Sequence, residues 1–469
     1  MNQITLPSAD LKQALPGLSK VVNRKSTLPV LQTIRVTRSP EGLVSLSATD
    51  LDAFVSYRLE QPQPGPSLDL LLPYEALTKT IKGSSGDLNV ILESKLKARL
   101  QYQVSGSPLE QSLATLPVEE FPPCPEVPQV PVKLPPHFGE CLRQAFETSS
   151  NDTSRYVLQG AYLDVSDPQC HTIVSTNGTA LFAANTFQFD FKASINLMRQ
   201  KFLEWPGFLT GECELAVKAD KTNSSWVKLT TPRWECTVKQ IDGNFPNWRQ
   251  VVPQDTEGWT KIQLSKAAIK QMLSLSSKLP GDDTENRPLQ LRADKELHLE
   301  GRNKVEFTGA VIPDVKITGK PVVAALNREY LQTALRCGLD EIRIQNELTP
   351  LLFLKPGKRL VVMPVRLQGP TPSPKAEAAK PAPEIPPTIT PPAIDPAQER
   401  KITMPEANKT AEPNALDKTE AIKTKLRELL GDLNDLTGLL KQADKDKRNT
   451  EKEVASVRQT IRSLQGVKI

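Results

Sequence analysis

Histidine and cysteine, the side chains that most often carry catalysis or bind metals, are few and scattered in this chain. The three histidines, His137, His171 and His298, lie far apart, each beside a strand or loop pattern. A histidine-based active site is therefore not expected, and each histidine is assigned a structural or surface role. The cysteines form no CxxC pair, so we expect no zinc site or disulfide framework and predict reduced core thiols at Cys124, Cys141, Cys170, Cys213, Cys236 and Cys337.

Two other motifs that could do chemistry also favour structural roles. The Gly83-Ser84-Ser85-Gly86 loop lacks the Lys-Ser/Thr pair that completes a phosphate-binding P-loop. Asp50 and Asp52 could act as paired carboxylates, but Asn177 takes the place of Asp50 in a second copy of the motif. A general acid or base cannot be replaced by an amide, whereas a turn-forming side chain can. We therefore expect a turn at Asp50, with no catalytic residue, no cofactor and no metal.

The motif around Asp50 belongs to a pattern that recurs three times, about every 125–130 residues. The copies begin at Thr27-Leu28-Pro29-Val30-Leu31, at Arg155-Tyr156-Val157-Leu158 and, more faintly, at Arg287-Pro288-Leu289. They end at Phe121-Pro122, Phe245-Pro246 and Met363-Pro364. A chain built by triplication usually makes a shape, so we expect the shape to matter more than any reactive group.

Apolar residues at helical spacing predict two helices in each repeat, with short alternating strands between them. The first pair contains Leu11, Leu15, Leu18 and Val22, interrupted at Pro16-Gly17, and then the segment Tyr74–Lys82. The second pair contains Phe138, Cys141, Leu142, Ala145 and Phe146, and then Ile195, Met198 and Phe202. The third contains Leu264, Ala268, Met272 and Leu275, and then Tyr330, Leu331, Ala334 and Leu335. This alternation predicts α+β domains whose sheets are covered by helices on one face.

The chain has room for three such domains followed by a tail of different composition. We place the domains at residues 1–125, 126–255 and 256–368. Residues 369–415 are rich in Pro, Ala, Lys and Glu and are predicted to be a disordered linker. Residues 416–466 carry apolar side chains at coiled-coil spacing from Ile422 to Leu464, weakened at Lys447 and Thr450, where a break or helical hairpin stays open.

Charge and hydropathy limit the function classes. The net charge of +5 is small for 469 residues, so attraction to DNA would have to come from where the cations lie. The amino terminus has no signal-peptide pattern, and no apolar run approaches the roughly 20 residues of a membrane span. A cytoplasmic protein without membrane contact is expected.

Taken in order, the motifs of residues 1–367 resemble the bacterial sliding clamps, the β subunits of DNA polymerase III. The landmarks are the Thr27 and Arg155 motifs, Ala48-Thr49-Asp50-Leu51, Ser112-Leu113-Ala114-Thr115-Leu116-Pro117, Asp242-Gly243-Asn244-Phe245-Pro246-Asn247-Trp248 and Val361-Val362-Met363-Pro364-Val365-Arg366-Leu367. The resemblance implies three domains of one DNA-clamp fold per protomer and two protomers closing head-to-tail into a ring. Helices would line the hole and sheets would form the outer wall.

The resemblance also implies partners and the residues that meet them. Double-stranded DNA would be held without sequence preference, through phosphate attraction rather than base contacts. Arg24 is the best-supported cation, because family members carry an arginine at the matching position. The other candidates are Lys20, Lys25, Lys79, Lys82, Arg143, Arg199, Lys201, Lys266, Lys270, Arg328 and Arg336, with ordinary solvated helix cations as the alternative.

Family members bind partner peptides in an apolar pocket between the second and third domains. Position by position, the resemblance assigns to it Leu158, Thr176, Gly178, Leu181, Pro246, Val251, Val361, Met363, Pro364, Val365 and Arg366. Such a pocket suits Leu and Phe anchors, although Val251 and Val361 could be plain core residues. Family members commonly show Asp-Gly-His-Arg-Leu where this chain has Asn177-Gly178-Thr179-Ala180-Leu181, and Gln250 replaces another frequent Arg. Ring closure is assigned to Leu113, Leu273 and Leu275.

The sequence therefore predicts a non-enzymatic processivity clamp, a homodimeric ring that tethers polymerase to DNA. Its expected partners are DNA polymerase III subunits, the clamp loader and other proteins with a clamp-binding motif. The altered pocket rim and the added tail motivate one alternative, a clamp-derived structural or regulatory scaffold that no longer encircles DNA. An enzyme with an unfamiliar site is a third. The carboxy-terminal heptads would recruit a partner or self-associate, with an exposed single helix as the alternative.

Overall fold

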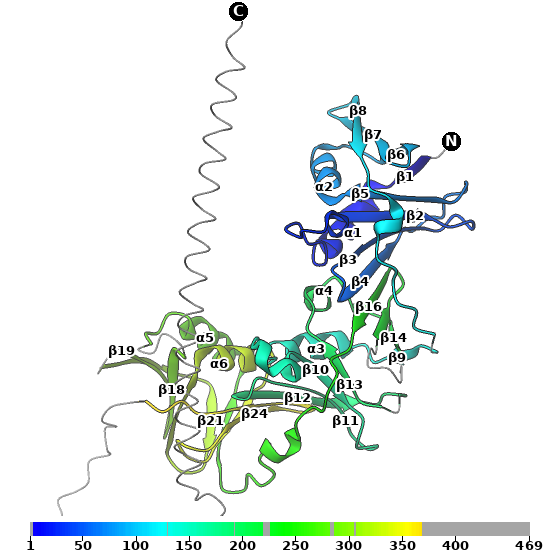
Figure 1. The fold of residues 1–469 in the computed structure, drawn as a ribbon. Coiled ribbons are helices and arrows are strands. Elements are labelled where there is room, and N and C mark those ends of the chain that lie inside the picture. Colours follow the sequence, from blue (N-terminus) through cyan, green and yellow to red (C-terminus); the bar gives the residue numbers. More distant parts are fainter. Residues whose placement is uncertain are drawn as a thin grey trace, which may run out of the picture. The chain divides into compact units, whose positions relative to one another are not determined.

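The computed structural model describes residues 3–128, 130–191, 193–218, 226–281, 286–303 and 306–367. The chain separates into one unit from Met1 to Pro374 and another from Lys375 to Ile469, and all described residues belong to the first (Figure 1). The predicted linker and coiled coil lie outside the described residues.

The first unit uses one arrangement of elements three times: a strand, a helix, four strands, a helix and three strands. In the first copy these are β1 (Gln3–Leu6), α1 (Ser8–Leu18), β2 (Thr33–Arg38), β3 (Val44–Thr49), β4 (Ala53–Arg58), β5 (Leu68–Pro73), α2 (Tyr74–Gly83), β6 (Leu88–Ser94), β7 (Lys97–Val104) and β8 (Ser107–Ala114). We call this copy, with its loops, the first repeat.

The second and third repeats follow the same order. The second has β9 (Val132–Leu134), α3 (Phe138–Phe146), β10 (Gly160–Asp164), β11 (His171–Thr176), β12 (Ala180–Phe187), β13 (Ile195–Met198), α4 (Lys201–Glu204), β14 (Cys213–Lys218), β15 (Trp226–Thr230) and β16 (Trp234–Lys239). The third has β17 (Thr260–Leu264), α5 (Lys266–Ser276), β18 (Pro288–Ala293), β19 (Leu297–Asn303), β20 (Glu306–Ile312), an additional β21 (Val315–Thr318), β22 (Val322–Asn327), α6 (Arg328–Arg336), β23 (Glu341–Ile344), β24 (Leu351–Lys355) and β25 (Lys358–Val362). Short 3₁₀ turns lie at η1 (Pro29–Gln32), η2 (Val118–Glu120), η3 (Thr153–Leu158) and η4 (Trp248–Val251).

Apart from β21, the order of strands within the sheets is the same in all three repeats, as is the order of elements along the chain. The four strands between the two helices pair as β5-β2-β3-β4, β13-β10-β11-β12 and β22-β18-β19-β20, and the remaining strands as β1-β6-β7-β8, β9-β14-β15-β16 and β17-β23-β24-β25. Two antiparallel pairs join neighbouring repeats, β4 with β16 and β12 with β25. They fuse the half-sheets into one eight-stranded and one nine-stranded sheet. The predicted α+β triplication is thus confirmed, while the exact domain boundaries remain a prediction.

Each helix buries its apolar side on the sheets, as the spacing predicts. Leu11, Ala14 and Leu18 of α1 are fully buried, and α1 packs on β3, β4 and α2. Phe138, Leu142 and Phe146 of α3 are likewise buried against β10, β11 and β12. Figure 1 shows α3, α5 and α6 along the same face of the nine-stranded sheet. Strand residues facing the helices form the main core, and alternate residues face the other side, which we call the outer face.

Two helix predictions need correction. Ile195, Met198 and Phe202 do not form one helical stripe, because Ile195–Met198 is strand β13, which pairs with β10. Only one helical turn, α4, follows it. Ile195 and Leu197 alternate with more polar neighbours, a strand period that the three-residue spacing concealed. In the first repeat, α1 continues through Pro16 but ends at Leu18, so Val22 lies beyond the helix.

The turn at Asp50 is confirmed. Its Oδ1 atom accepts hydrogen bonds from the backbone N–H groups of Asp52 at 3.2 Å and Ala53 at 2.8 Å. In the second repeat Asn177 Oδ1 accepts in the same way from Thr179 and Ala180, at 3.0 and 2.9 Å. Carboxylate and amide perform the same turn-forming task.

Among the described residues, no helix is long and apolar enough to cross a bilayer. The same residues contain no group of three or more His, Cys, Asp or Glu side chains placed to hold a metal ion.

Candidate peptide pocket and DNA-facing helices

The seam between the second and third repeats carries a small apolar cluster of its own. Leu181 of β12 pairs with Val361 of β25, which in turn pairs with Leu352 of β24. These side chains pack with others into a cluster separate from the main core, made of Val174, Leu181, Ala183, Trp248, Val252, Trp259, Leu352 and Val361. Ile173, Phe182 and Ala184, which alternate with three of them, belong to the main core. The separate cluster therefore lies on the outer face.

The residues assigned to the peptide pocket surround this cluster. Leu181 and Val361 form its buried floor, at 3% and 4% exposure, whereas Val251 and Met363 are 57% and 48% exposed. Thr176, Leu158, Pro364 and Val365 are half-buried, and Gly178, Pro246 and Arg366 are exposed. Of the two assignments left open, Val361 is buried in the cluster and Val251 is a surface side chain.

Backbone contacts bring the segments of this site together. The N–H of Met363 donates to the carbonyl of Thr179 at 2.8 Å, and Val365 donates to Ala325 at 2.8 Å. These bonds place the chain after β25 between the β11–β12 turn and β22. Gly178 allows that turn, since its φ is +92° and a Cβ there would lie 2.9 Å from Arg155 Nη1. Tyr162 and Phe245 stack at 4.7 Å, which joins β10 to the loop before η4.

Tyr330 bridges the two repeats here, a role that the sequence analysis did not assign to it. Its hydroxyl, on α6, lies 2.8 Å from Asn177 Nδ2 and 2.7 Å from Thr179 Oγ1. Both partners occupy positions where the chain departs from the family's Asp-Gly-His motif, and that departure was the available signal. The turn at the pocket rim is thus hydrogen-bonded to a helix of the third repeat.

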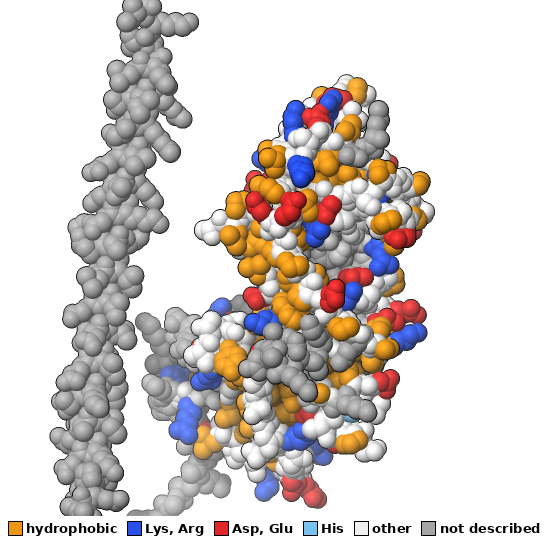
Figure 2. All heavy atoms as spheres, turned by 45° about the vertical axis from the view of Figure 1, so that its right-hand side comes forward, with side chains coloured by type: hydrophobic (Ala, Val, Ile, Leu, Met, Phe, Trp, Pro, Cys, Tyr) orange, Lys and Arg blue, Asp and Glu red, His pale blue; other side chains and the backbone are white. Residues whose placement is uncertain are grey.

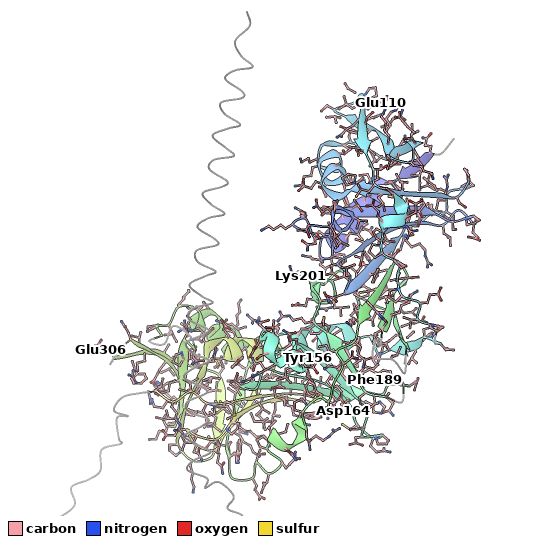
Figure 3. The ribbon with its side chains drawn as sticks, viewed as in Figure 1. Glu110, Tyr156, Asp164, Phe189, Lys201 and Glu306 are labelled. Atoms are coloured by element: carbon pink, nitrogen blue, oxygen red, sulfur yellow. The ribbon has the colours of Figure 1, made fainter. Side chains whose placement is uncertain are left out.

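A buried carboxylate fixes the loop that carries η4. Asp164, labelled in Figure 3, lies at the end of β10 and is 2% exposed. It accepts hydrogen bonds from Trp248 Nε1 at 2.8 Å and Arg249 Nη1 at 2.7 Å. Burial alone would raise the pKa of Asp164, but bonds from the hydroxyl and N–H of Ser166, from Trp248 and from Arg249 hold it below its ordinary value. The carboxylate therefore stays ionised and anchors Trp248, a member of the apolar cluster.

The cations predicted in the first repeat are all solvent-exposed. Arg24 lies in the loop after α1, with its guanidinium carbon 4.8 Å from the centre of the Tyr74 ring. The others lie in the same loop or on α2 and make no ion pair with described residues: Lys20, Lys25, Lys79 and Lys82. Their exposure and their lack of ion pairs with described residues fit a basic group that faces solvent.

The second repeat differs, because two of its three predicted cations, Arg143 and Arg199, are half-buried. Arg199 forms two hydrogen bonds with Glu204, at 2.8 and 3.0 Å, which raise the pKa of Arg199. Arg143 is half-buried on α3, and its Nη1 has no hydrogen-bond partner among the described residues. Lys201 alone is exposed, on α4 (Figure 3).

In the third repeat, Lys266 and Lys270 of α5 are exposed. Arg336 of α6 is also exposed, and it pairs with Glu147 of the second repeat at 3.3 Å. Arg328 needs a correction, since it is only 4% exposed and its Nη2 donates to the carbonyl of Pro280. Burial lowers its pKa, and the side chain cannot act as a surface cation because the loop after α5 packs over it.

The leucines assigned to ring closure are half-buried against the main core: Leu113 on β8, and Leu273 and Leu275 on α5. β8 and β20 are edge strands of their four-stranded sheets, and Figure 3 marks Glu110 on the first and Glu306 on the second. Each edge also exposes an apolar side chain, Leu109 at 44% and Val311 at 43%.

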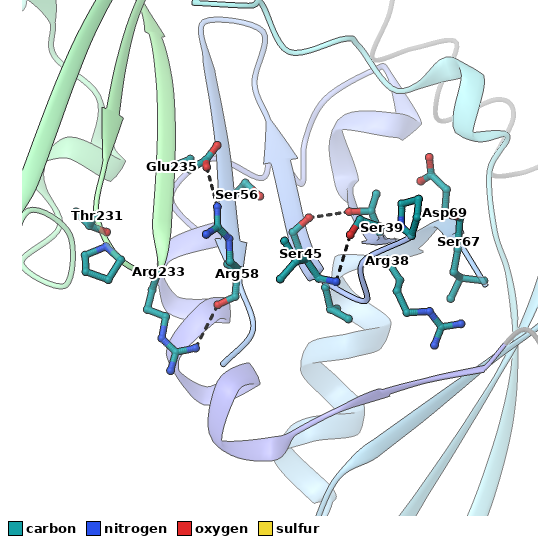
Figure 4. Close-up of a pocket in the computed structure, with 16 residues that line it drawn as sticks. Arg38, Ser39, Ser45, Ser56, Arg58, Ser67, Asp69, Thr231, Arg233 and Glu235 are labelled. Atoms are coloured by element: carbon teal, nitrogen blue, oxygen red, sulfur yellow. Dashed lines mark hydrogen bonds and ion pairs between the residues drawn. The ribbon is translucent and has the colours of Figure 1, made fainter. Parts of the chain in front are cut away.

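A cavity of about 480 Å³ opens on the outer face of the eight-stranded sheet (Figure 4). Two of its lining hydroxyl groups, Thr37 Oγ1 and Ser45 Oγ, are hydrogen-bonded to each other at 2.6 Å. Among its charged groups, Arg58 donates to Glu235 at 3.1 Å and Asp69 is held by Arg35. Arg38 donates instead to the backbone carbonyls of Pro66 and Gln3. None of the lining serines is bonded to a base, so this arrangement does not constitute an activated nucleophile. Figure 2 shows Lys and Arg interspersed with Asp and Glu on the visible face, without a large patch of one sign.

The tripled half-sheets, the two helices per repeat and the fused sheets define the α+β sliding-clamp fold. The chain matches no protein-family model. It is 23% identical over 352 residues to the beta sliding clamp of Vibrio cholerae, a match that covers 73% of this chain and 92% of the relative. The beta sliding clamp of Pseudomonas putida is 24% identical over 379 residues, covering 77% and 99%. The chain is thus a homologue of the bacterial beta sliding clamp over about 78% of its length.

Solved structures share the same fold. The sliding clamp of Pseudomonas aeruginosa, bound to griselimycin, matches with a TM-score of 0.65 at 21% identity, covering 78% of this chain and 99% of that one. The sliding clamp of Bacillus subtilis matches with a TM-score of 0.65 at 16% identity, again over 78% and 99%. Since these matches span nearly the whole of the clamps but not of this chain, the tail is an addition to the fold.

Proposed function

We propose that this protein is a DNA sliding clamp, a processivity factor that encircles duplex DNA as a ring and tethers DNA polymerase III subunits and other partners. Its role needs no chemical step at the protein, and a clamp loader would open the ring. The proposed domains are residues 1–125, 126–255 and 256–368, with a tail of residues 369–415 and 416–466 that recruits a partner or self-associates.

The observation that carries this proposal is a pair of edge strands that match the strands joining neighbouring repeats but lack a second partner strand among the described residues. Within the chain, β4 of the first repeat pairs with β16 of the second, and β12 of the second pairs with β25 of the third. The matching strands of the next junction would be β20 of the third repeat and β8 of a first repeat. Both are edge strands within the described residues, and exposed edges offer unpaired N–H and C=O groups. A second copy would satisfy them head-to-tail, and two copies would close a ring.

The proposed peptide pocket is the apolar cluster at the second junction. A buried floor of Leu181 and Val361 flanked by exposed Val251 and Met363 favours a peptide with apolar anchors. Because the clamp would recognise DNA only through phosphates, the same ring could serve any polymerase that carries such a peptide.

The deciding experiment measures retention of the full-length protein on DNA after loading by its cognate loader. A ring remains on closed circular duplex and escapes once the circle is linearised. Equal retention on both forms, or retention on neither, would refute the ring and favour a scaffold that no longer encircles DNA.

Binding of a polymerase-derived peptide tests the pocket separately. Met363→Ala should weaken peptide affinity about tenfold or more, because the side chain is exposed at the rim and its loss leaves the core intact. Leu348→Ala, at an exposed site on the β23–β24 connection, is the matched control. Unchanged binding by Met363→Ala would refute the assigned pocket.

A further inference from the structure

The helix layer of the three repeats is charged unevenly. In the first repeat the segments 8–25 and 74–83 carry six Lys or Arg against two acidic residues. In the third, segments 266–278 and 328–336 carry five against one. In the second, segments 138–147 and 199–204 carry three of each. The helices between two basic repeats are therefore electrically neutral.

Local contacts deepen this difference. All six cations of the first repeat are exposed, as are Lys266 and Lys270 of α5 and Lys278 in the loop that follows it. None of the eight lysines in these segments makes an ion pair with a described residue. In the second repeat Glu204 holds Arg199 at 2.8 Å, and Glu147 draws in Arg336 of α6 at 3.3 Å. Exposed Glu140 of α3 is itself paired with Lys358 of β25 at 2.8 Å.

The second helix of each repeat also differs in length, and it is shortest in the second repeat. The helix that follows the four-strand half spans ten residues in α2 and nine in α6, but only four in α4. The second repeat thus offers a shorter helical surface as well as fewer free cations. A phosphate approaching it would meet cations already paired with Glu140, Glu147 and Glu204, so that little net attraction remains.

We propose that the DNA backbone is held by two separate basic surfaces, the helix segments of the first and third repeats, and that the helix segments of the second repeat form a neutral gap without phosphate contact. This inference rests on the proposed clamp function. In a head-to-tail ring the first repeat of one copy adjoins the third repeat of the other. The two surfaces then merge across each interface into one basic arc, and the ring holds two arcs separated by two gaps.

Salt dependence of DNA binding tests the arrangement, because each lost phosphate contact makes the slope of log affinity against log salt shallower by up to about 0.9. Three variants remove one exposed helix lysine each: Lys79→Gln on α2, Lys270→Gln on α5 and Lys201→Gln on α4. Full-length protein is titrated with a short duplex at several salt concentrations, and thermal unfolding verifies that each variant is folded.

We expect shallower slopes for Lys79→Gln and Lys270→Gln and an unchanged slope for Lys201→Gln. The triple variants Lys20→Gln/Lys25→Gln/Lys79→Gln and Lys266→Gln/Lys270→Gln/Lys278→Gln should each extend the loss to about 2–3. The inference is overturned if Lys201→Gln lowers the slope as much as the other two, or if neither of those lowers it. Retention of the wild type on circular DNA is judged independently, so a failed clamp and a failed charge assignment give different results.

Discussion

At the scale of single residues, burial decides which side chains of similar type are available. Lys270 and Arg328 both accompany an apolar helical stripe, yet Lys270 is exposed and Arg328 is 4% exposed. Periodicity gives the side of a helix on which a residue lies, but not the loop that later packs over it. The Tyr330 bridge was missed for a similar reason, since it joins residues about 150 positions apart.

Replacing Asp164 should weaken the peptide pocket through the loop that it anchors, although Asp164 is not one of the residues assigned to the pocket. Asp164→Asn replaces a buried acceptor of the Trp248 and Arg249 bonds by a group that carries N–H donors. We expect the free energy of unfolding to fall by about 2–4 kcal/mol. Peptide affinity should also fall, because η4 carries Val251. Chemical unfolding and peptide titration measure the two effects.

The sign of the pH dependence follows from the depressed pKa of Asp164. A carboxyl group whose pKa is lower in the folded than in the unfolded state stabilises the protein at pH values above the unfolded pKa, ordinarily 3.8. This stability is lost as the pH falls through the folded pKa. The difference between wild type and Asp164→Asn should therefore be full near neutral pH and shrink on acidification. Asp190→Asn, at an exposed position, is the control and should change little. A difference independent of pH would contradict the ionised anchor.

At the scale of elements, the helix spacing located five of the six helices, and α2 was placed within one residue of its end. The failure at Ile195 arose where a strand of four residues precedes one helical turn, since neither element is long enough to display its own period. Propensity and pattern are weakest for such short elements, because tertiary pairing, here with β10, decides their conformation.

The packing of α1 on the second repeat gives the next prediction. A Cβ at Gly17 would collide with the ring of Trp234 and lie 2.7 Å from Trp205. Those rings pack edge-to-face at 5.4 Å, with Phe202 and Tyr57 beside Trp234. Gly17→Ala should therefore destabilise the protein by about 1–3 kcal/mol through overpacking.

Gly83→Ala is the matched control for that substitution. Gly83 ends α2, and a Cβ there would meet no atom within 4 Å. Alanine should be neutral or stabilise by up to about 1 kcal/mol, because it reduces the entropy of the unfolded chain. Thermal unfolding of both variants checks the pair, and equal effects would show that α1 does not depend on close approach to the tryptophans.

At the scale of the whole molecule, the triplication explains why two edges remain. A tandem of three repeats makes two internal junctions and leaves one unmatched strand at each end, β8 and β20. The sequence supported the repeats and the proposed ring through resemblance, but it could not reveal this topology, because strand pairing between distant segments leaves no local signature. Exposed apolar side chains on both edges, Leu109 and Val311, are costly in an isolated protomer.

The two edges lead to a prediction about assembly. If β8 and β20 pair between copies, the double variant Leu109→Lys/Val311→Lys should bury two like charges in each interface. The dissociation constant of the dimer should then rise at least about tenfold. Sedimentation should then detect the 51.8 kDa protomer where the wild type forms the dimer. Leu96→Lys, at a 55% exposed site in the β6–β7 turn, should leave the dimer intact. A double variant that remains dimeric would exclude edge pairing. If the double variant loses both dimerisation and retention on circular DNA, the ring depends on these two strands.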